Sequence, residues 1–322
     1  MRRALRILGR CFAALLVILA VIAIWAYEPD IPAARLEERY ASDGHSQFMA
    51  LMGMRVHFRD QGPRSDSLPL VLVHGTSSSL HTWDSLVAMM SAQKRLIRMD
   101  LPAFGLTGPH PAGDYSIGAY NRFLNSFLTR LGVDSFIMAG NSLGGAIAWN
   151  HAVAYPGKVR GLILVNAGGY PRKDEKGSLG FKLAAMPVVG SILTSCTPRW
   201  LIRKSIGNAY YDPSRISEET VTRYHEMILR EGNRDATLSL FRTRNRPSPE
   251  RIRELRCPTL VLWGRHDQLI SVDNAAKFGR DIPGARVVVL ENSGHVPMEE
   301  NPVETAAEVR RFLSASFEGR NR

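Results

Sequence analysis

The chain of 322 residues is predicted to be an α/β protein with a mostly parallel sheet that helices cover on both faces. Three observations predict this class. Short apolar runs such as residues 68–73 alternate along the chain with helix-favouring stretches such as residues 116–131. The runs are continuously apolar, as expected of strands buried on both faces. A serine flanked by glycines, Ser142, lies where one of these strands meets the helix that follows.

The first segment is apolar and follows several arginines. Residues 11–27 contain seventeen residues without a charge, which as a helix would be about 26 Å long, near the lower limit for crossing a bilayer. The sequence therefore predicts a signal-anchor over residues 1–27, with a cytoplasmic N-terminus and the rest of the chain on the periplasmic or extracytoplasmic side. A cleaved signal peptide is the alternative. Against it, the apolar run is long for a signal peptide, and cleavage after Ala26 would need a small residue where Ile24 stands.

A polar, proline-containing linker with one helical turn is expected over residues 28–45, and the strands begin after it. Residues 47–52 and 54–59 read as a hairpin around Gly53. The remaining predicted strands cover residues 68–73, 94–99, 135–139, 161–165, 260–263 and 286–290. The predicted helices between them include residues 116–131, 145–155 and 272–278.

The alternation stops between Tyr170 and Cys257, where only helix-like patterns occur. These patterns cover residues 181–193, 200–206, 218–230 and 235–241. A helical insertion at the carboxyl ends of parallel strands would lie over an active site. The sequence thus predicts a helical cap over residues 171–256, inserted into a core formed by residues 46–170 and 257–322.

Composition and cysteine content restrict the function. The formal net charge of +11 suits an anionic membrane surface or nucleic acid. Because no basic-aromatic nucleic-acid module is visible, nucleic-acid binding is not expected. The three cysteines, Cys11, Cys196 and Cys257, match neither a disulfide scaffold nor a zinc site.

Ser142 is the predicted nucleophile. It lies within residues 140–144, Gly-Asn-Ser-Leu-Gly, where a sharp strand-to-helix turn holds the hydroxyl clear of the sheet. At the helix start, the backbone N–H of Leu143 would point to a developing oxyanion. The loop after residues 68–73 contains Gly75, which leaves the Thr76 N–H free as the second donor. The alternative role for Ser142 is helix capping.

A serine nucleophile needs a histidine base, and the base needs a carboxylate that fixes its tautomer. His295 follows the last predicted strand and Asp267 follows the preceding one, so both should meet Ser142 at one edge of the sheet. Asp273 is the alternative acid, although it fits the first turn of a helix better. At the end of the strand after the nucleophile stands Asn166, which cannot serve as the acid.

Three further polar residues near the motifs are predicted to be structural. His74 is expected to hold its own loop by hydrogen bonds, and Asp100 to brace a turn beneath the site. His266 neighbours Asp267 but is expected to face the other way on an extended loop.

Taken together, these motifs resemble the α/β-hydrolase superfamily over residues 54–170 and 257–317. The resemblance rests on His74-Gly75, Asp100-x-Pro102-x-Phe104-Gly105, Gly140-Asn141-Ser142-Leu143-Gly144-Gly145, Gly264-x-x-Asp267 and Gly294-His295. It implies hydrolysis of carboxylic esters through an acyl-enzyme, with no metal and no organic cofactor. The serine at position 142 departs from haloalkane dehalogenases and epoxide hydrolases, which carry an aspartate there.

The leading anchor, the His-Gly loop and the helical cap make the chain similar to membrane-bound members of the monoacylglycerol-lipase type. This similarity implies a small-molecule or lipid ester with a short or medium acyl chain as substrate, and contact with a membrane through the anchor. Two other functions stay open. One is C–C bond hydrolysis of ring-cleavage products. The enzymes of that class carry a glycine-rich loop after the His-Gly pair, which residues 76–78 of this chain do not match. The other is a non-catalytic scaffold of the same fold, which would usually lack triad residues.

Overall fold

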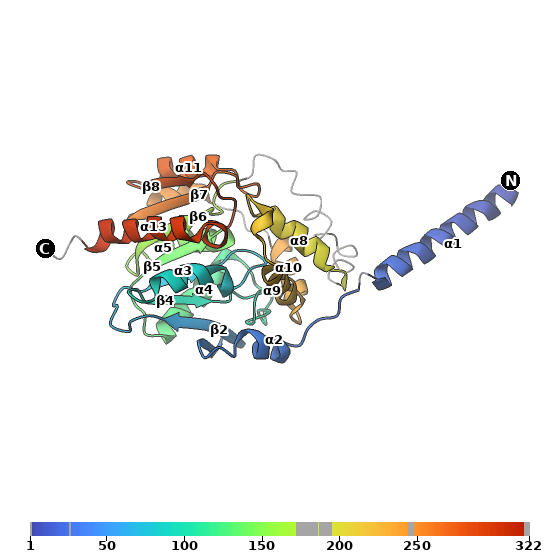
Figure 1. Ribbon diagram of the computed structural model, residues 1–322, viewed down its shortest axis with the longest axis horizontal. Coiled ribbons are helices and arrows are strands. Elements are labelled where there is room, and N and C mark those ends of the chain that lie inside the picture. Colours follow the sequence, from blue (N-terminus) through green and yellow to red (C-terminus); the bar gives the residue numbers. More distant parts are fainter. Residues whose placement is uncertain (1, 26, 172–185, 187–194, 244–247, 319–322) are drawn as a thin grey trace.

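The computed structural model describes residues 2–25, 27–171, 186, 195–243 and 248–318 (Figure 1). An eight-stranded sheet runs through it in the order β1-β2-β4-β3-β5-β6-β7-β8. The strands are β1 (Ser46–Leu51), β2 (Met54–Gln61), β3 (Leu70–Val73), β4 (Leu96–Met99), β5 (Phe136–Asn141), β6 (Val159–Val165), β7 (Thr259–Gly264) and β8 (Arg286–Leu290). This result confirms the predicted α/β class with a mostly parallel sheet.

The pairing of the strands defines the edge at which a site can form. β1 and β2 form the predicted antiparallel hairpin, and β2 also pairs antiparallel with β4. All other neighbours are parallel, from β4 through β3 to β8. After β3 the chain forms β4 on one side of it and then β5 on the other. Ligands bind at such a switch point, outside the carboxyl ends of the strands.

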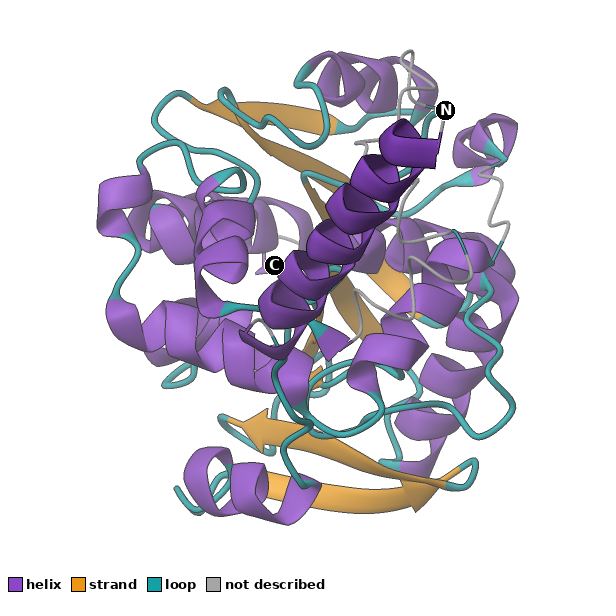
Figure 2. Cartoon of the chain, turned by 90° about the vertical axis from the view of Figure 1, so that its right-hand side faces the viewer, coloured by secondary structure: helices purple, strands orange, loops and turns teal. Residues whose placement is uncertain are grey.

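Helices cover both faces of the sheet because successive strand residues point to opposite faces. In β3, Val71 and Val73 pack in one core cluster, whereas Leu70 and Leu72 pack in the other. The first cluster is covered by α4 (Ile117–Arg130), α5 (Leu143–Ala154) and α11 (Asp273–Asp281). The second is covered by α3 (Asp84–Met90) and α13 (Pro302–Leu313). Figure 2 shows helices on either side of the strands.

Element boundaries follow local chemistry. β3 begins at Leu70, two residues later than predicted, because Pro69 has no N–H for the sheet ladder. β6 begins at Val159, two residues earlier than predicted, although Arg160 is exposed. α4 starts where expected, since the Ser116 hydroxyl accepts a hydrogen bond from the Ala119 N–H at 3.1 Å and so caps the helix.

Between β6 and β7 the described residues form helices. They include α8 (Arg199–Gly207), the 3₁₀ helix η2 (Pro213–Arg215), α9 (Glu218–Leu229), α10 (Asn233–Arg242) and the 3₁₀ helix η3 (Pro249–Glu254). Figure 1 shows α8, α9 and α10 grouped at one end of the sheet. The predicted helix over residues 181–193 lies outside the described residues except for Met186. The limits of the cap and of the other segments stay a prediction.

Residues 28–40, which we call the strap, run from the N-terminal helix across the cap. Ile31 forms a parallel bridge with Arg230, in which its N–H donates to the Leu229 carbonyl at 2.7 Å and its carbonyl accepts from the Glu231 N–H at 2.9 Å. The strap then forms α2 (Ala33–Tyr40), a helix of eight residues and longer than the single predicted turn. Its buried Leu36 packs against Met227 of α9, so the cap stabilises this helix.

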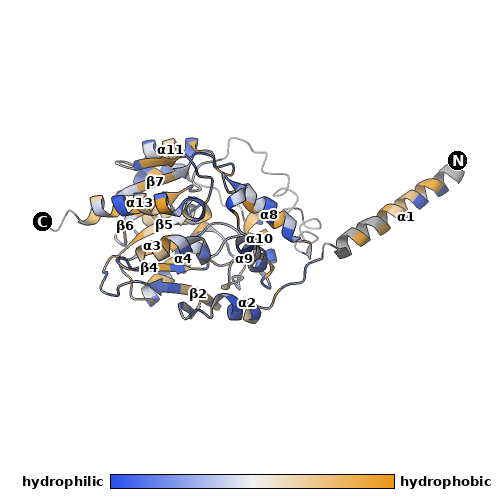
Figure 3. Cartoon of the chain, viewed as in Figure 1, coloured by the Kyte–Doolittle hydropathy of each residue, from blue (hydrophilic) through white to orange (hydrophobic). Residues whose placement is uncertain are grey.

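The N-terminal helix α1 (Arg2–Trp25) extends away from the rest of the molecule (Figure 1). Several of its apolar side chains are exposed, and Figure 3 shows their hydrophobic colour. The sequence predicts a helix here that spans a membrane. Judged on the residues that the structure describes, however, no helix has both the length and the apolar character needed for crossing.

Candidate active site

Ser142 lies at the sharp turn between β5 and α5. Its backbone has φ 56° and ψ −115°, in a region that costs a non-glycine residue about 1–3 kcal/mol. The turn is possible because its flanking positions lack side chains. A Cβ on Gly144 would overlap the Val73 carbonyl oxygen, and one on Gly140 would overlap the carbonyl of Gly144. The strain and the close packing together hold the serine at the carboxyl edge of the sheet.

Asp267 and His295 meet at the same edge. Asp267 follows β7 and His295 follows β8, and the carboxylate oxygen Oδ2 lies 2.8 Å from Nδ1 of the imidazole. The other oxygen, Oδ1, accepts backbone hydrogen bonds from Leu269 at 2.8 Å and Ile270 at 2.9 Å. Because a carboxylate accepts, Nδ1 must carry the hydrogen. No described residue bonds Nε2, which is therefore free to take up a proton.

The serine and the histidine are linked through Asn141. The Asn141 side-chain amide donates to the backbone carbonyl of His295 at 2.9 Å and to that of Val165 at 3.2 Å. Among the described residues no hydrogen bond joins the Ser142 hydroxyl to the His295 ring. Hydrogen bonds of this kind are often long in enzymes without substrate and tighten when substrate binds.

The loop after β3, residues 74–78, lies against the Ser142 turn. The Cβ that Gly75 lacks would be 3.1 Å from Oδ1 of Asn141 and 3.1 Å from Cβ of Ser142. Within the described residues, neither the Thr76 N–H nor the Leu143 N–H donates a hydrogen bond to another protein group. Both predicted oxyanion donors thus remain available for a ligand.

Hydrogen bonds hold this loop from beneath, as predicted for His74 and Asp100. Nε2 of His74 accepts from the Leu101 N–H at 2.9 Å, and Nδ1 donates to the Gly75 carbonyl at 2.8 Å. Burial lowers the pKa of His74, so its ring is neutral, as these two bonds require. Asp100 accepts from the Leu80 N–H at 2.7 Å and lies 2.8 Å from Nδ1 of His57.

The Asp100 carboxylate is charged despite being fully buried. Burial opposes the charge, but the neighbouring His57 and the backbone donors outweigh it and lower the pKa of Asp100. Sequence reasoning missed His57, because β2 also contains Arg55, Arg59 and Asp60 and nothing local distinguishes His57 from these other polar residues. The partner that explains it lies 43 residues away in the chain.

Asn166 is a second residue that sequence reasoning did not assign to the site. It was excluded as an acid, yet its side-chain amide donates to Oδ2 of Asp267 at 2.7 Å. The same amide lies 3.3 Å from the Gly294 carbonyl. Asn166 therefore supports the carboxylate that is predicted to act. Its position at the end of β6, on the active edge of the sheet, is the signal that could have found it.

The cap holds the loop that carries His295. The His295 N–H donates to the carbonyl of Ala209 at 2.6 Å. The Glu300 carboxylate accepts from the Gly294 N–H at 2.7 Å and from the Asp212 N–H at 2.8 Å. Glu300 ends the short helix α12 (Pro297–Glu300), which begins two residues after His295. This helix thus joins the histidine loop to the cap.

The two remaining candidates have structural roles. The His266 ring stacks on Tyr211, with 4.0 Å between ring centroids, in agreement with its predicted role. Asp273 is the first residue of α11 and is exposed, in the first helical turn where it was expected. Among the described residues, no group of His, Cys, Asp and Glu side chains is arranged to hold a metal ion.

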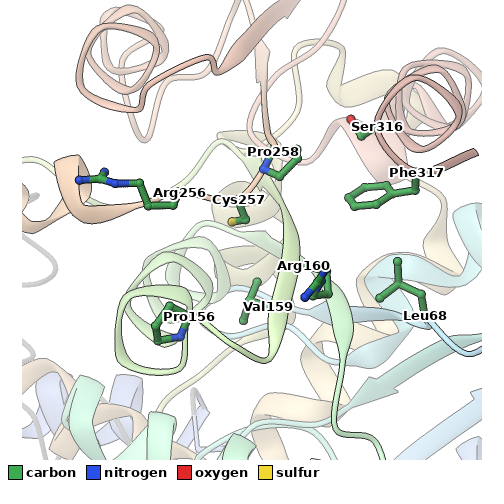
Figure 4. A pocket seen from close by; sticks show the side chains of 9 residues that line it. All are labelled: Leu68, Pro156, Val159, Arg160, Arg256, Cys257, Pro258, Ser316 and Phe317. Carbon is green, nitrogen blue, oxygen red and sulfur yellow. The ribbon is translucent and has the colours of Figure 1, made fainter. Parts of the chain in front are cut away.

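A surface pocket of about 330 Å³ lies elsewhere on the molecule (Figure 4). Its lining includes Val159 at the start of β6, Pro258 just before β7, and Phe317. Val159 and Pro258 lie at the amino ends of parallel strands, whereas Ser142, Asp267 and His295 follow carboxyl ends. The pocket is therefore separate from the predicted site.

Comparison with known proteins gives consistent matches over most of the chain. The profile of the family described as alpha/beta hydrolase fold matches residues 69–302. Epoxide hydrolase 3 of Xenopus tropicalis is 25% identical over 98% of this chain and 95% of that protein. A 2-hydroxy-6-oxo-2,4-heptadienoate hydrolase of Pseudomonas putida is 28% identical over 77% of this chain and 89% of that protein.

Two further matches concern lipid hydrolases. Monoacylglycerol lipase abhd6-A of Xenopus laevis is 23% identical over 87% of this chain and 83% of that protein. The crystal structure of a membrane phospholipase A has the same fold, with a TM-score of 0.73 at 22% identity and coverage of 100% of both chains.

Proposed function

Because this chain belongs to the α/β-hydrolase fold family, we propose that it is a serine hydrolase that cleaves carboxylic esters through an acyl-enzyme intermediate. The observation that carries the proposal is the hydrogen bond of 2.8 Å between Asp267 and His295, at the edge of the sheet where Ser142 occupies its strained turn. This pairing of acid and base beside a half-buried serine is what activation of a hydroxyl requires.

In the proposed mechanism, Oγ of Ser142 attacks the ester carbonyl carbon while Nε2 of His295 takes the hydroxyl proton. Asp267 stabilises the imidazolium that results, through Nδ1. The carbonyl oxygen becomes an oxyanion and accepts hydrogen bonds from the N–H groups of Thr76 and Leu143. His295 returns its proton to the leaving alcohol as the C–O bond breaks. Water, deprotonated by the same nitrogen, then releases the acid and regenerates the serine.

The nature of the bond cleaved is the finer part of the proposal. The epoxide hydrolase of Xenopus tropicalis is a relative, but the nucleophile position here is Ser142, which forms an acyl-enzyme from an ester. Similarity to a monoacylglycerol lipase favours lipid esters or esters with short to medium acyl chains. The second candidate is C–C bond hydrolysis, which the Pseudomonas putida relative favours.

We also propose that α1 holds the protein at a membrane, with the N-terminus in the cytoplasm and the catalytic domain on the extracytoplasmic side. Arginines precede the apolar part of the helix, as expected for a cytoplasmic end. Leu15, Val17 and Val21 of this helix are more than half exposed. Apolar side chains exposed along one extended helix favour contact with lipid.

The test uses the full-length protein in detergent with a series of chromogenic esters and a fluorophosphonate probe. We expect wild type to react with the probe and to hydrolyse esters, and Ser142→Ala to lose about 10⁶-fold in kcat. Ser316→Ala is the matched control, because this serine lines the pocket at the opposite edge. Equal labelling of wild type and Ser142→Ala would contradict the proposal. Turnover of a vinylogous diketone without any ester turnover would favour the C–C hydrolase.

A further inference from the structure

A buried carboxylate outside the proposed catalytic residues joins the core to the cap. Glu299 of α12 has a side chain only 8% exposed. Its Oε1 accepts from the hydroxyls of Thr82 and Tyr224, the latter at 2.5 Å. Its Oε2 accepts from the hydroxyl of Tyr210 at 3.1 Å and lies 3.5 Å from Nη2 of Arg223. Thr82 belongs to the core and the other three donors to the cap, so we call these five residues the cap junction.

Tyr224 extends the cap junction to the loop after β3. Its hydroxyl oxygen lies 3.3 Å from Oγ of Ser78. Since the single O–H of Tyr224 is donated to Glu299, Ser78 must be the donor in this second bond. Burial, together with the nearby Glu299 charge, raises the pKa of Tyr224, so its hydroxyl stays protonated and keeps donating.

The segment that Tyr224 holds is strained. Ser77, directly before Ser78, has φ 56°, a left-handed conformation that L-residues other than glycine adopt at a cost of about 1–2 kcal/mol. Such a conformation persists only where its surroundings fix it. On one side Gly75 packs against the Ser142 turn, and on the other side Ser78 is bonded to Tyr224. Thr76 lies between these two points.

We propose that Tyr224 is a positioning residue for the loop after β3, residues 74–78, which we call the oxyanion loop. By holding Ser78, it fixes the Thr76 N–H in the orientation needed to bind the oxyanion. The oxyanion site is then complete only while the cap is seated on Glu299. This inference rests on the proposed function, in which Thr76 is an oxyanion donor. It assigns to a cap residue a role in the chemical step as well as in enclosing substrate.

Two tyrosine variants separate a positioning role from a general effect on stability, because each removes one hydroxyl that donates a hydrogen bond to Glu299. Tyr224→Phe breaks the connection to Ser78, whereas Tyr210→Phe leaves it intact. We expect Tyr224→Phe to lower kcat about tenfold, part of the 10²–10³-fold typical of losing an oxyanion donor outright, with KM within about twofold. Tyr210→Phe should keep kcat within about twofold, with a melting temperature lowered as much as that of Tyr224→Phe.

A double-mutant cycle tests the connection itself. Ser78→Ala should lower kcat as much as Tyr224→Phe, and the double variant should be no slower than either single variant. Independent, multiplicative losses would overturn the proposal, as would equal kcat values for Tyr224→Phe and Tyr210→Phe.

A measurement without turnover separates this inference from the proposed function. Amide hydrogen exchange at residues 76–78 should be faster in Tyr224→Phe than in Tyr210→Phe, and equal exchange would overturn the positioning role. Wild type that neither hydrolyses esters nor reacts with fluorophosphonate would instead contradict the proposed function. Active wild type with identical tyrosine variants would contradict this inference alone.

Discussion

At the residue scale, most of the groups that hold the proposed catalytic carboxylate of Asp267 do not react. All the acceptor capacity of the Asp267 carboxylate is in use, since it takes bonds from His295, Asn166, Leu269 and Ile270. The carboxylate therefore cannot turn away from the imidazole without losing several bonds at once. Such preorganised polar groups stabilise transition-state charge without needing to reorient during the reaction.

His151 of α5 presents the opposite situation, a buried imidazole without support. Neither of its ring nitrogens hydrogen-bonds another described residue, and the ring lies 4.6 Å from that of Tyr155. Burial, together with the charge of Lys158, lowers the pKa of His151 to about 4. The folded state thus binds this proton less readily than the unfolded state, whose value is about 6.5.

The lowered pKa of His151 makes the folded state less stable in acid. Above pH 6.5 the ring is neutral in both the folded and the unfolded state, and the free energy of unfolding is unaffected. As the pH falls from about 6.5 to about 4, the free energy of unfolding decreases by about 3 kcal/mol in total. We predict that His151→Phe removes most of this loss. Urea unfolding at pH 7 and pH 5 measures it, with the exposed His45→Phe as control. An unchanged pH dependence in His151→Phe would contradict the assignment.

The residue scale also shows what sequence patterns can identify. Ser142, Asp267 and His295 each follow a recognisable strand within a short motif, so their placement at one edge could be predicted. Glu299 and Tyr224 carry no such local signal, because their bond joins positions 75 residues apart in the chain. Only the packing of the cap on the core brings them together.

At the scale of elements, the strap shows how non-local packing changes a local expectation. The prolines of this segment favour a linker with a single turn, yet α2 has eight residues. The difference arises because Leu36 packs with Met227 and Leu106, and because Arg39 and Tyr40 bind Glu226 of α9. The partners in α9 lie almost 200 positions away and Leu106 lies 70 positions away, where a local pattern cannot reveal them.

We predict that Leu36→Ala loosens the strap from the cap. Truncating a buried leucine costs about 2–5 kcal/mol, which here acts on the strap and its contacts. The amide of Glu231, which donates to Ile31, should exchange faster with solvent. Hydrogen exchange measures this change, and Val303→Ala is the control because Val303 is 68% exposed. Unchanged protection of Glu231 in a destabilised Leu36→Ala protein would contradict this role of the strap.

Strand and helix types were largely predictable from the sequence. Continuous apolar runs identified the buried strands, and Gly53 identified the hairpin between β1 and β2. The ends of the elements were less predictable. β3 starts two residues later than predicted because Pro69, which precedes it, has no N–H for the sheet ladder. The predicted helix over residues 181–193, of which only Met186 is among the described residues, remains a prediction.

At the scale of the whole molecule, the strand order places the functional loops on one edge. The loops after β3, β5, β7 and β8 all leave carboxyl ends of parallel strands. The cap helices α8, α9 and α10 lie between β6 and β7 in the chain. Within this cap, Ala209 bonds the loop that carries His295, Asp212 bonds Glu300 beside that loop, and Tyr224 contacts Ser78 in the loop after β3.

Localisation is the prediction that belongs to this scale. We expect the full-length protein to sediment with membranes and to need detergent for release, because α1 exposes apolar side chains. A variant without residues 1–27 should remain in the supernatant. Ser142→Ala, with α1 intact, should fractionate as wild type does. Recovery of full-length protein in the soluble fraction would contradict membrane attachment. The orientation is tested separately: protease added outside spheroplasts should digest the catalytic domain.

The bridge between the strap and the cap also has a consequence for biosynthesis. Ile31 leaves the ribosome early, whereas its partners Leu229 and Glu231 are translated roughly 200 codons later. The beginning of the globular part must therefore wait, unpaired, until nearly three quarters of the polypeptide has been made. A nascent chain halted before Arg230 should accordingly leave the strap open to protease, and elongation past that point should close it.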